Sequence, residues 1–196
     1  MFSLNKMKSE IENIIYSVKL DDIISLTNLI SSKILLNKSV FFCGNGGSGA
    51  TANLFAFKLI QIEKVRAKAY SLNNNMASIT GSSDKFNYAQ SFNQQLESLG
   101  REGDLLIAIS GSGNSPNIIN VVKAAKQLGI NTFGLTGMGG GELAELVDQS
   151  IIVESYSMQQ IENLHSVIVS SILKLMEKHH EQLLNENNTI SVLSSN

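Results

Sequence analysis

The chain has few of the residues that would indicate an oxidising compartment, a metal cluster or a membrane. Its one cysteine, Cys43, cannot form a disulfide within the chain, and no cysteine–histidine group has zinc-finger spacing. No apolar run approaches the roughly 18–20 residues that span a bilayer. Only 16% of the residues are charged and the net charge is −2, so a basic surface for nucleic acid is not expected. These absences favour a cytoplasmic protein that binds neither membranes nor nucleic acid directly.

The apolar residues, 43% of the chain, follow the pattern of a parallel α/β protein. Short apolar runs predict five strands, at residues 40–43, 67–72, 105–110, 132–136 and 150–153. Helical spacing predicts two helices within residues 9–36 and a last helix from Met158 to about Leu184. We therefore expect a three-layer α/β/α domain with a five-stranded parallel sheet over residues 37–184. Residues 1–36 add N-terminal helices that pack on the domain and on other subunits, and residues 185–196 are expected to fray.

A glycine-rich turn, Gly44–Gly49, follows the first predicted strand and contains the spacing G-x-G-x-x-G. A dinucleotide site would also need an acidic residue near the end of the second strand, where this chain has Asn73. A Walker P-loop would need lysine after the last glycine, where Ala50 and Thr51 stand. Both nucleotide interpretations are weakened, although a ligand at the carboxyl edge of the sheet is still expected.

A second loop of small residues, Ser110–Ser115, separates the third strand from a helix that starts at the only proline, Pro116. Backbone amides, serine hydroxyls and a helix N-terminus together suit one phosphate group without a lysine. The alternative is that Ser115 only caps the helix and the glycines only turn the chain. The fourth strand is followed by a further loop of this kind, in LTGMGGGELAEL.

Four motifs together resemble one family. They are CGNGGS at 43–48, GREGDLLIAISGSGNSPNII at 100–119, LTGMGGGELAELVD at 135–148 and QIENLH at 160–165. The sequence resembles the SIS (sugar isomerase) domain proteins over about residues 5–182, in particular phosphoheptose isomerases and replication-initiator-associating proteins. The resemblance implies a flavodoxin-like fold, a sugar-phosphate ligand and a homotetramer.

The resemblance also implies which residues bind the ligand. Those that would line the sugar are Asn45, Gly46, Gly47 and Ser48. Those that would hold the phosphate are Ser110, Ser112 and Ser115, and Gly111 among them stands where the family usually has threonine. The family's aspartate corresponds to Asp84 or, in an ungapped alignment, to Lys85, so Asp84 is a candidate sugar ligand.

The catalytic positions of the family are not retained. Phosphoheptose isomerases bind zinc and move the proton with a His and a Glu on the helix after the first loop and a Gln and a His on the last long helix. Aligned without gaps, the first pair corresponds to Leu54 and Lys58 and the second pair to Glu162 and Ser170. The resemblance therefore implies zinc in the family but no zinc ligand set here. Glu162 and His165 lie one helical turn apart and could replace the base and the acid. The alternatives are a packing histidine, a solvated carboxylate, or a Lys58–Glu162 ion pair in place of the metal.

The function implied is that of a phosphosugar-binding protein of phosphoheptose isomerase type. The family reaction converts sedoheptulose 7-phosphate to D-glycero-D-manno-heptose 7-phosphate, a step towards lipopolysaccharide heptose. Because the catalytic residues are replaced, the alternative is a non-catalytic sugar-phosphate sensor or a regulatory protein that associates with another protein such as the replication initiator.

Overall fold

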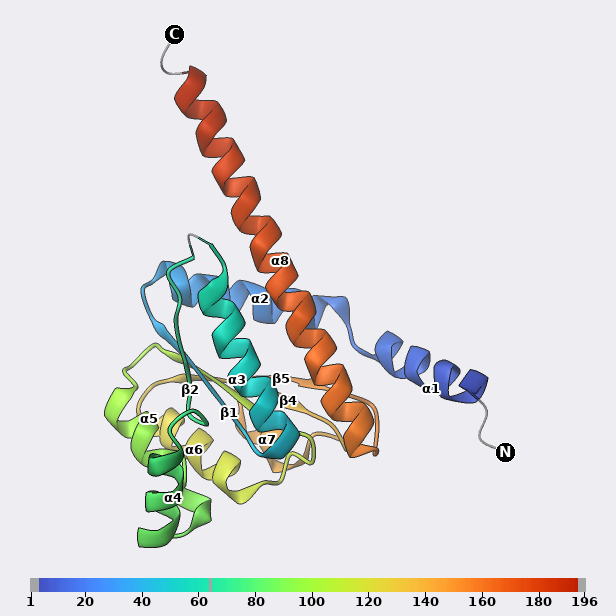
Figure 1. The fold of residues 1–196 in the computed structure, drawn as a ribbon, viewed down its shortest axis with the longest axis vertical. Coiled ribbons are helices and arrows are strands. Elements are labelled where there is room, and N and C mark those ends of the chain that lie inside the picture. The colour runs from blue at the N-terminus through green and yellow to red at the C-terminus, as the bar shows by residue number, and fades with distance from the viewer. Residues whose placement is uncertain (1–3, 64, 194–196) are drawn as a thin grey trace.

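A computed structural model describes residues 4–63 and 65–193 of the chain, arranged around one central sheet (Figure 1). The sheet has the strand order β2-β1-β3-β4-β5, and every neighbouring pair is parallel. The strands are β1 (Ser39–Gly44), β2 (Lys68–Ser71), β3 (Leu105–Ser110), β4 (Asn131–Thr136) and β5 (Gln149–Ile152). The predicted five-stranded parallel sheet is confirmed, and the strand order is the flavodoxin-like one.

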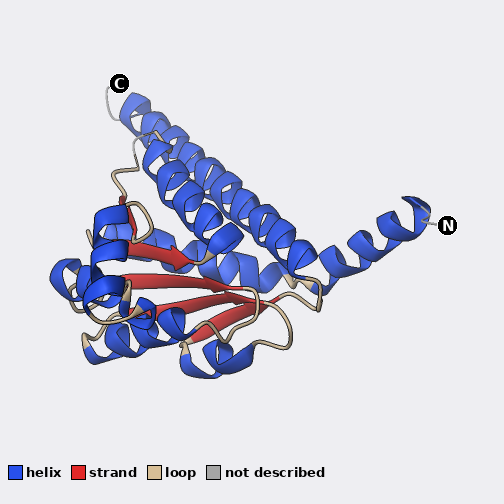
Figure 2. Ribbon diagram, turned by 60° about the horizontal axis from the view of Figure 1, so that its bottom comes forward, coloured by secondary structure: helices blue, strands red, loops and turns tan. Residues whose placement is uncertain are grey.

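Helices cover both faces of the sheet, which makes the three layers visible in Figure 2. The face that carries the last helix is covered by α2 (Leu20–Leu35), α3 (Gly46–Gln61) and α8 (Met158–Leu193). The helices of the opposite face are α4 (Met76–Lys85), η1 (Tyr88–Gln90), α5 (Asn93–Leu99), α6 (Pro116–Gln127) and α7 (Gly141–Leu146). The remaining helix, α1 (Leu4–Ser17), precedes α2.

Successive residues of the central strands alternate between two hydrophobic cores. In β1, Val40 and Phe42 belong to the core under α2, α3 and α8, whereas Phe41 and Cys43 belong to the core under α5, α6 and α7. All six residues of β3 are buried, as expected for a parallel strand with helices on both sides. Burial raises the pKa of the Cys43 thiol, in keeping with the role of a small buried apolar residue.

The last helix is longer than the sequence pattern predicts. The apolar period ends near Leu184, but α8 continues to Leu193. No glycine or proline lies between Met158 and Leu193 to stop it. The sequence predicts a frayed tail from residue 185; in the structure residues 185–193 continue the helix, and residues 194–196 lie outside the described part of the chain.

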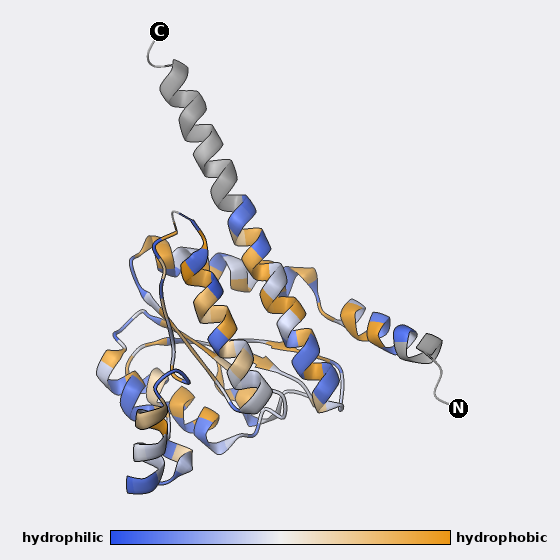
Figure 3. Ribbon diagram, viewed as in Figure 1, coloured by the Kyte–Doolittle hydropathy of each residue, from blue (hydrophilic) through white to orange (hydrophobic). Residues whose placement is uncertain are grey.

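The N-terminal helix α1 leads away from the sheet, and Figure 3 shows apolar residues along it. Ile11 and Ile15 are 41% and 43% exposed. Only Ile14 and Val18 in this stretch pack against the core under α2, α3 and α8. Within the part of the chain that the structure describes, part of the apolar stripe is therefore left exposed. Among the residues that the structure describes, no helix combines the length and the apolar character needed to cross a bilayer.

A buried histidine joins α8 to the central sheet. His165 is fully buried, and its Nε2 lies 3.1 Å from the carbonyl oxygen of Thr136 at the end of β4. Because a carbonyl only accepts, Nε2 carries the proton in the neutral ring. Nδ1 has no hydrogen-bond partner among the described residues. Burial lowers the pKa of His165, and the bond to Thr136 opposes that shift.

We expect this histidine to make the fold sensitive to acid. A folded-state pKa below the unfolded value means that protonation favours the unfolded chain. Its stabilising effect is complete above about pH 6.5, the unperturbed histidine pKa, and is lost as the pH falls below it. The free energy of unfolding, measured with denaturant, should fall more between about pH 7.5 and about pH 5 for the wild type than for His165→Gln, because glutamine does not titrate. Equal losses would contradict the prediction.

Candidate active site

The candidate site lies at the carboxyl edge of the sheet, between β1 and β3. These strands are hydrogen-bonded neighbours, yet the chain leaves β1 towards β2 on one side and leaves β3 towards β4 on the other. Such a switch point opens a crevice for ligands in parallel sheets. The strands β1, β3 and β4 end here in the glycine loop (residues 44–49), the serine loop (residues 110–115) and the third loop (residues 137–141).

Close backbone packing shapes the glycine loop. A Cβ on Gly44 would lie 2.5 Å from the backbone oxygen of Ser48, so only glycine allows the strand to turn so directly into α3. The side chain of Asn73 fixes the turn, since its amide nitrogen donates to the Gly44 oxygen at 2.7 Å and its oxygen accepts from the Gly44 nitrogen at 3.2 Å. Asn73 thus has a structural role at the position where a dinucleotide fold would carry a ribose-binding acid.

The four predicted sugar-lining residues do not all face solvent. Gly46 and Gly47 are exposed, Asn45 is half-buried, and Ser48 is only 4% exposed. The first turn of α3 therefore presents mainly backbone at this edge. Amides in the first turn of a helix lack intrahelical acceptors, which makes them suitable donors to a ligand.

Asn45 is held by two residues that were not among the predicted site residues. It forms a reciprocal amide pair with Asn117, in which each side-chain nitrogen donates to the other oxygen at 2.8 Å. The hydroxyl of Tyr88 also donates to the Asn45 oxygen at 2.8 Å. This bridge ties the glycine loop to the first turn of α6. The signal for Asn117 was its place directly after Pro116, but its partner lies 72 positions away in the sequence.

The serine loop has the properties of an anion site. Gly113, with φ of +67°, turns the chain, and its nitrogen donates to the Ser110 oxygen at 3.0 Å. Ser115 is the N-cap residue of α6 but makes no side-chain capping bond; instead the Ser110 hydroxyl donates to it at 3.2 Å. The backbone nitrogen of Asn114 donates to the hydroxyl oxygen of Ser112 at 3.2 Å. The alternative that Ser115 only caps the helix therefore does not describe its side chain.

The third loop supports the serine loop through the backbone. The Gly137 nitrogen donates to the Gly111 oxygen at 3.0 Å, and the Leu143 nitrogen donates to the Gly113 oxygen at 2.9 Å. The side-chain oxygen of Asn114 accepts from the nitrogen of Glu142 at 3.0 Å. These bonds fix the serine loop from behind without using the hydroxyls of Ser112 and Ser115 as donors.

The first turns of α8 lie directly on a glycine from each loop. A Cβ on Gly111 would lie 2.5 Å from the sulfur of Met158, which explains why a threonine has no room at this position. A Cβ on Gly137 would lie 2.6 Å from Cγ1 of Ile161. A Cβ on Gly47 would lie 2.5 Å from the carboxyl carbon of Glu162. The glycines thus allow α8 to approach all three loops.

The structure gives different surroundings to the two residues proposed as base and acid. The carboxylate of Glu162 lies against Gly47 at the start of α3, beside the predicted sugar-binding residues. His165 is fully buried and is bonded to Thr136 of β4, so its ring is not accessible to a ligand. The geometry of His165 is that of the packing alternative, whereas Glu162 lies at the site.

The four positions that correspond to the family's zinc site do not fit the metal. Leu54 is an exposed side chain of α3, and the Lys58 Nζ lies 5.7 Å from the ring centroid of Phe57. The Ser170 hydroxyl donates to the Ser166 oxygen at 2.9 Å. The ion pairs of the described side chains do not include one between Lys58 and Glu162. Three or more grouped carboxylate, histidine or cysteine side chains, as zinc requires, are not found in the described residues.

Asp84 lies near the end of α4 and is exposed. The side-chain hydrogen bond from this region to the glycine loop comes from Tyr88 in η1. Tyr88 is 53% exposed, so its ring forms part of the surface next to Asn45. The structure thus brings Tyr88 to the site by direct contact, while Asp84 remains a candidate from resemblance alone.

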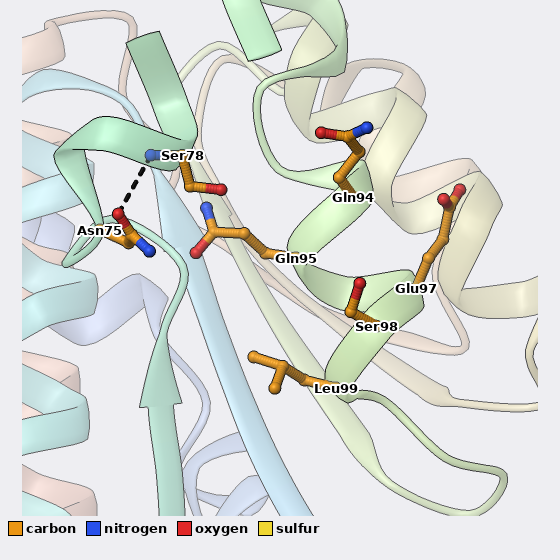
Figure 4. A pocket seen from close by; sticks show the side chains of 7 residues that line it. All are labelled: Asn75, Ser78, Gln94, Gln95, Glu97, Ser98 and Leu99. Atoms are coloured by element: carbon orange, nitrogen blue, oxygen red, sulfur yellow. Dashed lines mark hydrogen bonds between the residues drawn. The ribbon is translucent and has the colours of Figure 1, made fainter. Parts of the chain in front are cut away.

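A polar cavity of about 530 Å³ lies elsewhere, between α4 and α5 (Figure 4). Its lining consists of Asn75, Ser78, Gln94, Gln95, Glu97, Ser98 and Leu99. Several of these side chains hold the local fold: Asn75 caps α4 by accepting from the Ser78 nitrogen at 3.0 Å, and Gln95 donates to the Leu72 oxygen at 3.0 Å. None of the three loops contributes to this cavity, so we do not assign the site to it.

Comparison with known proteins agrees with this geometry. The SIS domain model matches residues 4–137. A phosphoheptose isomerase of Aliarcobacter butzleri is 37% identical over 141 residues, which are 70% of this chain and 75% of that protein. A phosphoheptose isomerase of Nitratidesulfovibrio vulgaris is 31% identical over 160 residues, 80% of this chain and 77% of its own length.

Solved structures give the same result. A phosphoheptose isomerase from Francisella tularensis superimposes with a TM-score of 0.82 at 28% identity, covering 91% of this chain and 100% of that one. The enzyme from Neisseria gonorrhoeae gives a TM-score of 0.79 at 28% identity, covering 88% and 92%. The chain therefore belongs to the SIS domain family, among the relatives of the phosphoheptose isomerases.

Proposed function

We propose that this protein binds a sugar phosphate of the heptose 7-phosphate class at the β1–β3 switch point and does not carry out zinc-dependent isomerisation. The phosphate lies on the serine loop and the sugar extends towards the glycine loop. The observation that carries the proposal is the side chain of Ser115, which stands at the N-terminus of α6 without capping it. A hydroxyl at this place can donate to an anion that the helix dipole also attracts.

The family relationship supports the ligand class. Both relatives described above are named phosphoheptose isomerases, and the chain covers about three quarters of their length. Their substrates are phosphorylated sugars, and the serine loop offers donors for one phosphate group. Asn45, held by Asn117 and Tyr88, and the exposed backbone of Gly46 and Gly47 would face the sugar hydroxyls.

The replaced residues are the reason for excluding the usual reaction. Aldose–ketose isomerisation needs a base for the C2 proton and an acid or metal to polarise the carbonyl. Glu162 could act as a base, but the nearby histidine is buried against β4 and the zinc positions hold no matching ligand set. A binding protein that senses a sugar phosphate, or that regulates a protein partner such as the replication initiator, is the function that this combination favours.

Binding should depend on the serine hydroxyls. The double variant Ser112→Ala/Ser115→Ala removes two donors to a charged group, each worth about 1.5–3 kcal/mol, so sedoheptulose 7-phosphate should bind at least roughly tenfold more weakly. Calorimetric titration measures the change. Ser31→Ala/Ser32→Ala on α2 is the matched control, because those hydroxyls donate only to carbonyls of their own helix. Equal affinity of the wild type and the first variant would place the phosphate elsewhere.

Zinc and turnover test the catalytic part of the proposal. We expect the purified protein to carry far less than one zinc per chain and to isomerise sedoheptulose 7-phosphate little or not at all, with or without added zinc. Loss of the base alone should lower the rate by roughly 10²–10⁴-fold. Elemental analysis and a coupled isomerase assay provide the data. Stoichiometric zinc, or rapid turnover that Glu162→Gln abolishes, would instead identify an isomerase with relocated catalytic groups.

We further propose that copies of the chain associate, as a tetramer or at least a dimer. A groove of about 320 Å³ runs between α1 and α8, and five of its lining residues are apolar, among them Ile11, Ile15 and Val167, while five are polar. All three are more than 40% exposed, which is unusual for a continuous apolar surface with no partner. Light scattering at micromolar concentration should give a multiple of the 21.3 kDa chain mass, and a monomer mass would refute the association.

A further inference from the structure

Two helices start at the candidate site, and each could attract an anion. α3 begins in the glycine loop at Gly46, and α6 begins after the serine loop at Pro116. Both are longer than three turns, so both N-termini carry unpaired amides and partial positive charge. On these grounds alone, a sugar with a phosphate at each end could use both helices.

One carboxylate makes the two helix starts different. Glu162 of α8 lies against Gly47, and a Cβ there would be 2.5 Å from its carboxyl carbon and 2.6 Å from Oε1. At the serine loop, the α8 residue that lies against a loop glycine is Met158, which contacts Gly111 and whose thioether is uncharged. The start of α3 therefore faces a negative charge supplied by the protein itself, and the start of α6 faces none from α8.

Neighbouring charges do not offset Glu162. Another carboxylate at this edge, Glu142, is paired with Lys123 at 2.9 Å. Among the described side chains the ion pairs do not involve Glu162, and Lys58 lies over Phe57 instead. A second phosphate at the glycine loop would meet a carboxylate that forms no ion pair with a described side chain, whereas a sugar hydroxyl would find a strong acceptor.

We propose that Glu162 restricts the site to monophosphorylated sugars, with the unphosphorylated end of the sugar at the glycine loop. The inference rests on the proposed phosphosugar function and adds the residue that would exclude a second phosphate. The carboxylate accepts a hydroxyl hydrogen from that end and repels a second phosphate. Glu162 is therefore a residue that determines specificity whether or not turnover occurs.

The test compares sedoheptulose 7-phosphate with sedoheptulose 1,7-bisphosphate by calorimetric titration. The wild type should bind the monophosphate at least tenfold more tightly than the bisphosphate. Glu162→Gln keeps the size of the side chain and removes its charge. The ratio of the affinity for the monophosphate to that for the bisphosphate should therefore fall at least fivefold. Glu177→Gln, the same substitution at an exposed position of the same helix, should leave the preference unchanged.

The outcomes separate this inference from the function on which it rests. If the monophosphate binds and the serine variants weaken it, but Glu162→Gln leaves the preference unchanged, the specificity role is wrong and the function stands. If neither ligand binds the wild type, both are wrong. A second measurement covers a variant that fails to fold: raising the salt concentration should narrow the wild-type preference, because screening weakens the repulsion. A preference that is insensitive to salt would overturn the inference.

Discussion

The close approach of α8 to three glycines determines which of its side chains lie at the carboxyl edge of the sheet. Gly47, Gly111 and Gly137 belong to three loops that are far apart in sequence, and a side chain on any of them would collide with α8. The same helix is tied to β4 through His165. Because interiors are close-packed, moving α8 would require all of these contacts to change together. The helix thus forms a fixed wall of the site.

This wall brings two kinds of side chain to the crevice. Met158 covers Gly111 with a polarizable but uncharged group, and the proposed phosphate site is the serine loop to which Gly111 belongs. Glu162 covers Gly47 with a carboxylate, which suits the glycine loop to hydroxyls. The proposed division into a phosphate end and a hydroxyl end depends on which residue of α8 meets which glycine. It needs no lysine or arginine in the loops, and residues 44–49, 110–115 and 137–141 contain none.

Much of the fold follows from local patterns in the sequence. Each strand ends within one residue of its predicted bound, because apolar runs in a sheet buried on both sides are interrupted sharply by glycine, serine and asparagine. The glycine and serine loops were recognisable for the same reason. The end of α8 was not, since the apolar period stops before the helical backbone does. Helix propensity without a breaker was enough to continue it.

The parts of the site that sequence reasoning missed depend on contacts between distant segments. Asn117 and Tyr88 matter because Asn45 lies between them, and no spacing rule connects these three positions. Glu162 and His165 are one turn apart on the same helix, which made an acid–base pair reasonable. Only the packing distinguishes them, because His165 turns to the Thr136 carbonyl while Glu162 reaches Gly47.

The central claim is that a sugar phosphate spans the serine and glycine loops. Backbone amide chemical shifts, measured by NMR during titration with sedoheptulose 7-phosphate, test it most directly because they report the site residue by residue. The account predicts the largest changes at residues 111–115 and at Asn117, with a second group at residues 46–48. Changes confined to the cavity between α4 and α5, around Asn75 and Gln95, would contradict it.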